Sequence, residues 1–445
     1  MKDSIDNTVI APDKGKKARK KARDLTVEDF YFLKIGNMWR YMKTQHFSFW
    51  MICCYIFFEY TRPQAIFPVI DFLPWAQLFI LLSLVGAVLD QSVRWVRNPI
   101  NLMMHAFALW IFLSSIYAFD SDISKRHYID FYSWYVIYFL IITIVNTRER
   151  FYVFMMVILI SMAKIAIGTA KQWTLRGFSF TGWGLMGPAG YFQNSGELAI
   201  LMLMLFPLAF YLYAYFKDDI NRWERWILIV FWVAPMLTIL GASSRGAQVA
   251  LAFQLLLMFY KQIFRIKSLI FISILLASFY YLLPEEQKER FSEAGEDKTS
   301  VQRLLYWEHG VEMIKDHPWL GVGFFNFPAY YGQYFSSDLL YPKAQLPHNI
   351  FIQVGTDGGV PALIIYVMIL MTGIGASWRY RLVNKGCGGI LRGLSFGMIG
   401  FGLAGQFVSV AYYPFIWIGS SLVVACVSIM KREKIMLNAR GDMSE

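Results

Sequence analysis

Three segments of the chain combine residue types that could bind an anion or move a proton. Residues 243–246 read SSRG, residues 347–349 read PHN, and residues 193–197 read QNSGE, each at the start of an apolar run. A helix N-terminus offers free backbone N–H groups and a partial positive charge, which together favour anions. A guanidinium beside such an end, as at Arg245, completes a clamp for phosphate.

Arg303 and His348 add to this chemistry. Arg303, within the polar segment TSVQRLLYWEHGVEMIK (299–315), supplies a second guanidinium. His348 stands at a predicted helix start, where the dipole opposes the imidazolium and leaves a ring nitrogen free to accept a proton. Each residue has a structural alternative: Arg245 anchors a helix end by snorkelling, Arg303 is a solvated charge, and His348 is a local cap.

The remaining polar residues of these segments take supporting or acceptor-side positions: Asn194, Glu197, Ser244, Asn349 and Asp357. Asp357 follows His348 by nine residues, about 13 Å along a helix. An acid at that depth in a membrane is costly unless it is paired or hydrated. We expect no metal, because the acids and histidines of 308–317 lack metal-ligand spacing. We expect no cofactor either.

The elements that must position these residues are membrane helices. Of 445 residues, 57% are hydrophobic and 16% charged, and the mean hydropathy is +0.42. Soluble chains carry about 25% charged residues, so a soluble enzyme, a disordered chain and a small disulfide scaffold are excluded. Continuous apolar runs disfavour an outer-membrane barrel. We expect an all-α polytopic membrane protein with about twelve spans.

The predicted spans are the twelve apolar runs near 46–61, 75–89, 100–118, 128–146, 151–170, 194–216, 225–243, 244–260, 267–283, 348–376, 389–409 and 412–430. Basic residues recur in every second connection, as the positive-inside rule requires when both termini are cytoplasmic. The net charge of +11 therefore records topology, and no nucleic-acid partner is expected. For the basic tail, a disordered cytosolic segment is favoured over an arm for nucleic acid or anionic lipid.

This layout divides the chain into five parts. Residues 1–45 form a basic cytosolic tail with a possible interfacial helix, 46–283 hold nine spans, and 284–347 form an extracytoplasmic loop with a helix at 299–315. Residues 348–430 hold three spans and 431–445 a cytosolic tail. Connections this long are usually functional, and the active site is expected on the extracytoplasmic side.

In order along the chain, these motifs resemble the O-antigen ligase and O-antigen polymerase superfamily of bacterial membrane glycosyltransferases. Within it, the chain is most similar to O-glycosylation ligases associated with exosortase systems. The resemblance rests on GPAGYFQNSGEL from Gly187, SRGA from Ser244, residues 284–290, Arg303-Leu304 with Trp307, HPWLGVGFFNF from His317, and PHNIFIQVGTDGGVPAL from Pro347. The family usually carries Glu where this chain has Asp357.

The resemblance implies a fold of the membrane glycosyltransferase C type. It also implies metal-independent, inverting transfer of a glycan from undecaprenyl pyrophosphate to a lipid, protein or glycan acceptor, on the outer face of the bacterial inner membrane. Arg245 and Arg303 would bind the pyrophosphate, and His348 would deprotonate or position the acceptor hydroxyl. A ligase is favoured over a repeat-unit polymerase that uses the same donor. A transporter of lipid-linked glycan is a more distant alternative, because it predicts repeated halves and charges near the bilayer midplane.

Overall fold

The computed structural model describes residues 21–31, 33–180, 184–188, 190–267, 297–380 and 385–441, together with residues 270 and 281. Within these ranges every regular element is an α- or 3-10 helix, and none is a strand. The all-α fold class is therefore confirmed. The basic cluster of the N-terminal tail, the predicted span 267–283 and the loop start at 284–296 lie wholly or almost wholly outside the described residues.

The helices fall into two halves separated by the long loop. The first half contains α1 (Ile35–Met42), α2 (Phe47–Thr61), α3 (Pro63–Ile66), α4 (Trp75–Leu89), α5 (Pro99–Ile116), α6 (Ser121–Arg126), α7 (Tyr128–Ile144), α8 (Arg148–Leu175), α9 (Ser195–Phe216), α10 (Arg222–Gly241) and α11 (Arg245–Ile263). The loop carries α14 (Lys298–Asp316) and α15 (Phe327–Tyr334), and the chain ends with α16 (Ile350–Arg379), α17 (Lys385–Ala404) and α18 (Pro414–Gly441).

Among the described residues, seven helices are long and apolar enough to cross a membrane: α5, α8, α9, α10, α16, residues 388–407 with α17, and residues 414–433 of α18. Three shorter apolar helices are α2, α4 and α7. With α11, these helices coincide with every predicted run except 267–283. The chain is a polytopic membrane protein, and the number of twelve spans stays a prediction.

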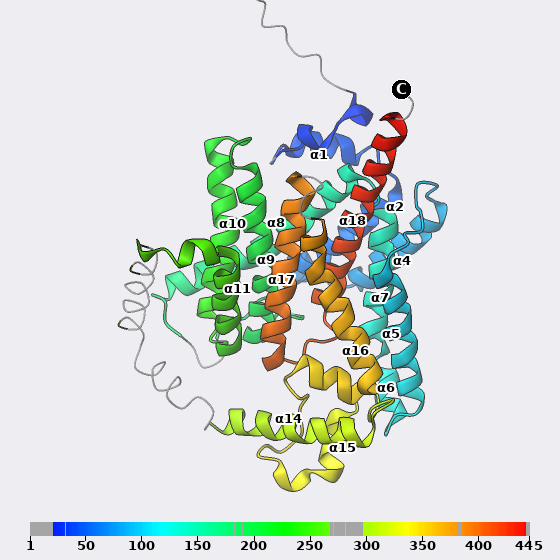
Figure 1. The fold of residues 1–445 in the computed structure, drawn as a ribbon, viewed down its shortest axis with the longest axis vertical. Helices are drawn as coiled ribbons and strands as arrows, with labels where there is room; N and C mark the ends of the chain where they lie inside the picture. Colours follow the sequence, from blue (N-terminus) through cyan, green and yellow to red (C-terminus); the bar gives the residue numbers. More distant parts are fainter. Residues whose placement is uncertain are drawn as a thin grey trace, which may run out of the picture.

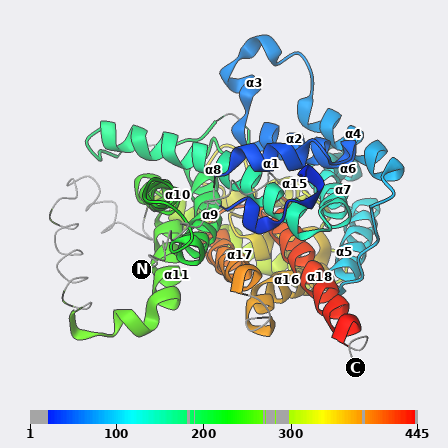
Figure 2. The ribbon, with the colours of Figure 1, turned by 90° about the horizontal axis from the view of Figure 1, so that it is seen from above.

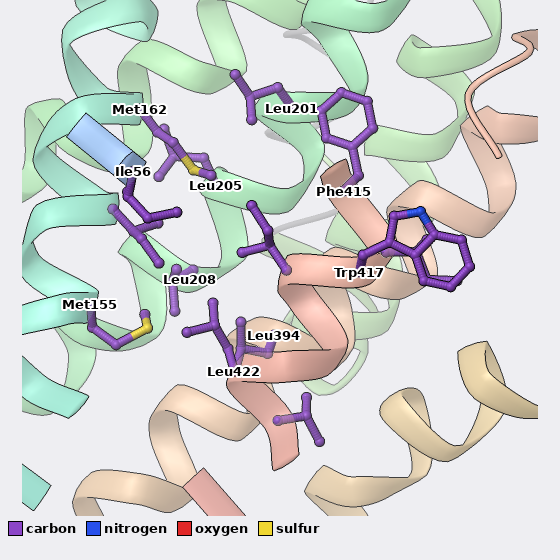
Figure 3. Packing of buried hydrophobic residues seen from close by; sticks show 14 of the residues in the cluster. Ile56, Met155, Met162, Leu201, Leu205, Leu208, Leu394, Phe415, Trp417 and Leu422 are labelled. Atoms are coloured by element: carbon purple, nitrogen blue, oxygen red, sulfur yellow. The ribbon is translucent and has the colours of Figure 1, made fainter. Parts of the chain in front are cut away.

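Helix α9 runs through the interior and packs against α17, α10 and α8. Leu201, Leu205 and Leu208 of α9 meet Met155 and Met162 of α8 in the cluster of Figure 3. On α17, glycines recur every four residues, and a Cβ on Gly393 would lie 2.7 Å from the Leu208 Cα. Small residues at this spacing let two helix backbones approach closely in a membrane.

The loop helices lie at one end of the bundle and the chain termini at the other. In Figure 1, α14 and α15 extend below the bundle, whereas α1 and the end of α18 lie at the top. Seen from above in Figure 2, α17 lies between the α9–α11 group and α18. The candidate residues of α14 therefore share the end of the molecule from which α16 starts.

The helix expected over 348–376 differs from the prediction in two ways. It begins at Ile350, and it is interrupted at Gly359, whose φ of 70° and ψ of −171° leave the helical region. The loop after α14 fills this interruption: Val322 N–H donates to the Thr356 carbonyl at 2.8 Å, and Val360 N–H to Pro318 at 2.8 Å. The long loop is thus tied directly into α16.

Candidate functional site

The first guanidinium stands at the start of α11. Ser244 occupies the N-cap position without a side-chain cap bond, and Ser243 before it has a left-handed φ of 56°. The Arg245 Nη2 lies 3.1 Å from the Asp297 Oδ2, with 40% of the arginine side chain exposed. This ion pair joins the start of α11 to the start of α14, 52 residues away.

Asp297 caps α14 as well as binding Arg245. Its Oδ1 accepts the Ser300 N–H at 3.0 Å, and its Oδ2 accepts the Ser300 hydroxyl at 2.6 Å. Partial burial raises the pKa of this carboxyl, but the hydrogen bonds from Ser300 and the Arg245 guanidinium outweigh it and lower the pKa to about 2. The carboxylate is therefore fully ionised at neutral pH.

The second guanidinium follows on the same helix. Arg303 is half-buried and close enough to Arg245, Asp297 and Tyr341 to interact with each of them electrostatically. Burial and the neighbouring Arg245 lower the pKa of Arg303, and its buried Nε forms no hydrogen bond. The two guanidiniums thus lie close to each other and to the Asp297 carboxylate, at the starts of α11 and α14.

His348 lies beside this pair, outside α16. Its φ is 53°, its N–H donates to the Ser409 Oγ at 2.7 Å, and its Nε2 lies 3.2 Å from the Gln345 Oε1. Burial, followed by the charge of Arg303, lowers the pKa of His348 to about 4. A neutral imidazole is expected from the sequence, and burial and the charge of Arg303 both act in that direction.

One face of α14 holds the segment that carries His348. Trp307 Nε1 donates to the Pro347 carbonyl at 2.9 Å, and the Tyr306 hydroxyl accepts the Gln345 N–H at 3.0 Å. Residues three and four apart share a helix face, so Tyr306 and Trp307 lie on the face that carries Arg303. The same short helix therefore positions the second guanidinium and the imidazole.

The predicted supporting residues mostly shape the helix starts around this centre. Asn194 caps α9 by accepting the Gly196 N–H at 2.8 Å, and Asn349 caps α16 by accepting the Phe351 N–H at 2.9 Å. A Cβ on Gly196 would lie 3.9 Å from the Ser244 Oγ, so the starts of α9 and α11 are adjacent. Glu197 accepts the Tyr413 hydroxyl at 2.9 Å.

Asp357 is set apart from the cluster. It is fully buried, and its Oδ1 accepts the Phe325 N–H at 3.1 Å while the Ser114 hydroxyl donates to its carbonyl. The Tyr412 hydroxyl lies close to the carboxyl and interacts with it. No basic residue in the described part of the chain pairs with Asp357. Its contacts secure the loop in the interruption of α16.

Residues 227–367 match a family model described as O-antigen ligase. This segment is similar to an O-antigen ligase domain, and the match covers less than half of the chain. The match supports the predicted O-antigen ligase and polymerase superfamily, and with it a membrane enzyme of the ligase or polymerase type in glycan assembly. No curated protein matches the chain. The likeness to exosortase-associated ligases stays a prediction.

The matched segment includes Arg245, Arg303, His348 and Asp357, whereas Asn194 and Glu197 precede it. Sequence reasoning missed three residues of the cluster: Asp297, Gln345 and Ser409. Asp297 carried a signal, because an acid directly before a helix is a preferred N-cap. Ser409 carried none, since it lies 61 residues from His348 and follows the matched segment.

Metal-ligating side chains do not gather in the described part of the matched segment. No group of three or more His, Cys, Asp and Glu suited to a metal is found among those residues. His309 instead binds Asp338 at 2.9 Å and Glu312 at 3.4 Å. The histidine and acids of α14 therefore act as a surface hydrogen-bond network.

Proposed function

We propose that this protein is a glycosyltransferase of the ligase type, which moves a glycan from undecaprenyl pyrophosphate to a lipid, protein or glycan acceptor. The reaction takes place on the extracytoplasmic face of the bacterial inner membrane, inverts the anomeric centre and uses no metal. The observation that carries the proposal is the convergence of Arg245, Arg303 and His348 from three separate segments.

The two guanidiniums stabilise the leaving group. When the bond between the anomeric carbon and the diphosphate breaks, negative charge develops on the departing diphosphate. Preorganised charged donors in a partly buried site stabilise such charge strongly. The Arg303 Nε has no hydrogen-bond partner and can donate to a phosphate oxygen, while Arg245 exchanges its contact with Asp297 for a second oxygen.

His348 receives the proton of the acceptor hydroxyl as that oxygen attacks the anomeric carbon. With the Gln345 Oε1 as acceptor, Nε2 carries the proton and Nδ1 is the basic nitrogen. The charge of Arg303 helps to depress the pKa of this imidazole. A diphosphate bound to Arg303 offsets that charge and raises the pKa of His348 towards the range in which a general base is effective.

A direct test uses the purified full-length protein in liposomes with a short undecaprenyl-pyrophosphate-linked glycan and a separate acceptor. We expect glycan on the acceptor in one step, with release of undecaprenyl pyrophosphate and no growth on the carrier, as shown by gel and mass spectrometry. A ladder on the carrier lipid would establish the polymerase instead. No release of undecaprenyl pyrophosphate with any acceptor, including a second donor molecule, would refute transfer altogether.

A further inference from the structure

A cavity lies away from the transfer centre, the site of Arg245, Arg303 and His348, and is enclosed between α9, α11, α16 and α17. Its volume is about 230 Å³. Its lining is Tyr211, Leu257, Met258, Tyr260, Ile374, Ser377, Trp378, Arg392, Ser395, Phe396 and Ile399. Helix α16 starts next to His348 and reaches this cavity only near its other end. The cavity therefore belongs to the opposite end of the bundle.

The lining changes from apolar to polar along α11, α16 and α17, three of the four helices that form it. On α16, Ile374 precedes Ser377 and Trp378 towards the helix end, and on α11, Leu257 precedes Tyr260. On α17, which starts at this end, Arg392 precedes Ile399 by seven residues, about 10 Å along the axis. One part of the cavity is thus apolar and the part nearer the membrane surface carries a charge.

Arg392 supplies that charge. It lies within the apolar stretch 388–407, where an ionised residue is costly and usually serves a function. Its charge acts on the Tyr211 hydroxyl, and no ion pair between Arg392 and a carboxylate is found in the part of the chain that the structure describes. The Tyr211 ring stacks on Phe396, with centroids 5.8 Å apart, and so forms a flat wall beside the guanidinium.

Aromatic and basic side chains mark this level as the membrane surface. Trp378 is 65% exposed and Tyr260 is 53% exposed, as in the aromatic belts at membrane–water interfaces. Lys261 lies over the Tyr260 ring at 5.7 Å, and Arg379 ends α16. Basic pockets between membrane helices are suited to anionic lipid head groups, and a guanidinium binds phosphate oxygens two at a time.

We propose that this cavity binds an anionic phospholipid from the leaflet opposite the His348 end. The headgroup phosphate contacts Arg392, with Ser377 and Tyr260 as further hydrogen-bond donors. One acyl chain follows the apolar side of the cavity past Ile374 and Ile399. The amphipathic gradient of the lining, together with a guanidinium that lacks a carboxylate, selects a lipid over a soluble phosphate compound.

The test measures lipid retention rather than glycan transfer, so its outcome is independent of the proposed reaction. Wild-type protein, Arg392→Gln and the matched control Arg225→Gln are titrated in mild detergent with phosphatidylglycerol or with phosphatidylcholine of the same chains, and adducts are counted by native mass spectrometry. Arg225 is an exposed arginine near the start of α10 that does not line the cavity. A charge-assisted hydrogen bond corresponds to about a tenfold or larger change in affinity.

We expect Arg392→Gln to weaken phosphatidylglycerol binding by that factor, and Arg225→Gln to retain wild-type affinity. A second variant, Ile374→Trp, fills the apolar side and is expected to weaken binding with Arg392 intact. Equal affinity for the two lipids in the wild type, or equal losses in the two arginine variants, would overturn the site. Unchanged binding in both Arg392→Gln and Ile374→Trp would do the same.

Discussion

At the scale of single residues, the site is governed by an imbalance of charge. Arg245 and Arg303 both interact with Asp297, whose pKa is lowered to about 2. Burial and the positive charge of Arg303 lower the pKa of His348. In the proposed function, a diphosphate bound between the two guanidiniums would reduce the repulsion between them.

The first prediction concerns the second guanidinium. We expect Arg303→Ala to lower kcat for transfer by about 10²–10³, as removal of a preorganised oxyanion donor does. Arg303→Lys should recover only part of this, because an ammonium lacks the planar fork of donors. Radiolabelled donor in liposomes measures both rates. Lys315→Ala, at an exposed lysine of the same helix, is the control and should transfer at the wild-type rate.

The second prediction concerns the pH profile of His348. With a pKa of about 4 in the free protein, the imidazole is neutral above that pH. Titration of His348 should therefore leave kcat/KM unchanged between about pH 8 and about pH 5. At lower pH, kcat/KM should fall as the imidazole becomes protonated. An unperturbed histidine would already cause a decline near pH 6.5. Since bound diphosphate offsets the Arg303 charge, kcat should decline at a higher pH than kcat/KM.

A variant separates this histidine from other titrating groups. His348→Ala is expected to lower kcat by about 10²–10⁴, the range for loss of a general base, and to remove the difference between the two profiles. Profiles that keep that difference in His348→Ala would contradict the assignment. Donor binding, measured as retention of the lipid-linked glycan, should persist in this variant because both arginines remain.

At the scale of elements, α14 couples binding to catalysis. Asp297, the N-cap of α14, binds Arg245, and the second turn of the helix carries Arg303. Further along the helix, Trp307 donates a hydrogen bond to the segment before His348. The loop that follows enters the interruption of α16 at Gly359. The relative position of Arg245, Arg303 and His348 thus depends on α14, on its hydrogen bond to Pro347 and on the loop that binds α16 at Gly359.

The third prediction tests the tether at Trp307. Trp307→Phe keeps an aromatic ring beside Phe407, 6.1 Å away in the native protein, but loses the N–H donor to Pro347. A lost hydrogen bond of about 0.5–1.5 kcal/mol predicts a kcat about 2–10-fold lower with little change in KM for the donor. Trp319→Phe, at a largely exposed ring of the same loop, should leave kcat unchanged. A change confined to KM for the donor would assign Trp307 to binding instead.

The fourth prediction tests the interruption of α16. In Gly359→Ala, the new Cβ would lie 2.5 Å from the Pro318 and Trp319 carbonyl oxygens, at a φ of 70°. Strain of about 1–3 kcal/mol should lower the Tm in detergent and release the loop. Gly375→Ala on the same helix meets no atom within 4 Å and should leave the Tm unchanged or slightly raised. Equal Tm values for the two variants would argue against the tether.

At the scale of the whole molecule, the bundle separates two ends with different chemistry. One end holds α14, α15 and the transfer centre, and the other holds α1 and the end of α18 (Figure 1). Basic residues gather near the second end, as Arg379 at the end of α16 illustrates. Positive charge on one side of a membrane protein marks the cytoplasmic side, which favours transfer on the opposite face.

The fifth prediction tests this orientation. A membrane-impermeant maleimide applied to spheroplasts should label Lys315→Cys on α14, but not Lys217→Cys after α9. Both positions are exposed, so both should react once the membrane is opened with detergent. The wild-type protein, with its native cysteines at 53, 54, 387 and 426, gives the background. Labelling of Lys217→Cys in intact spheroplasts would reverse the proposed sidedness.

Much of this arrangement could be predicted from local sequence. Apolar runs long enough for a bilayer specify membrane helices whatever their neighbours are, which is why α9 and α18 begin within two residues of the expected positions. The helix at 299–315 and the N-cap at Asn194 follow from short-range propensity and capping. Residue type also identified Arg245, Arg303 and His348 as candidates, because guanidinium and imidazole chemistry is intrinsic to the side chain.

Only the tertiary structure decided how those candidates meet. The pairing of Arg245 with Asp297 and of His348 with Ser409 joins segments 52 and 61 residues apart, and no periodicity in the sequence encodes such contacts. The partner of Asp357 proved to be a backbone N–H of the loop, because Gly359 opens α16 for that loop to enter. The low pKa of His348 likewise comes from burial and a distant guanidinium, which exist only after the helices have packed.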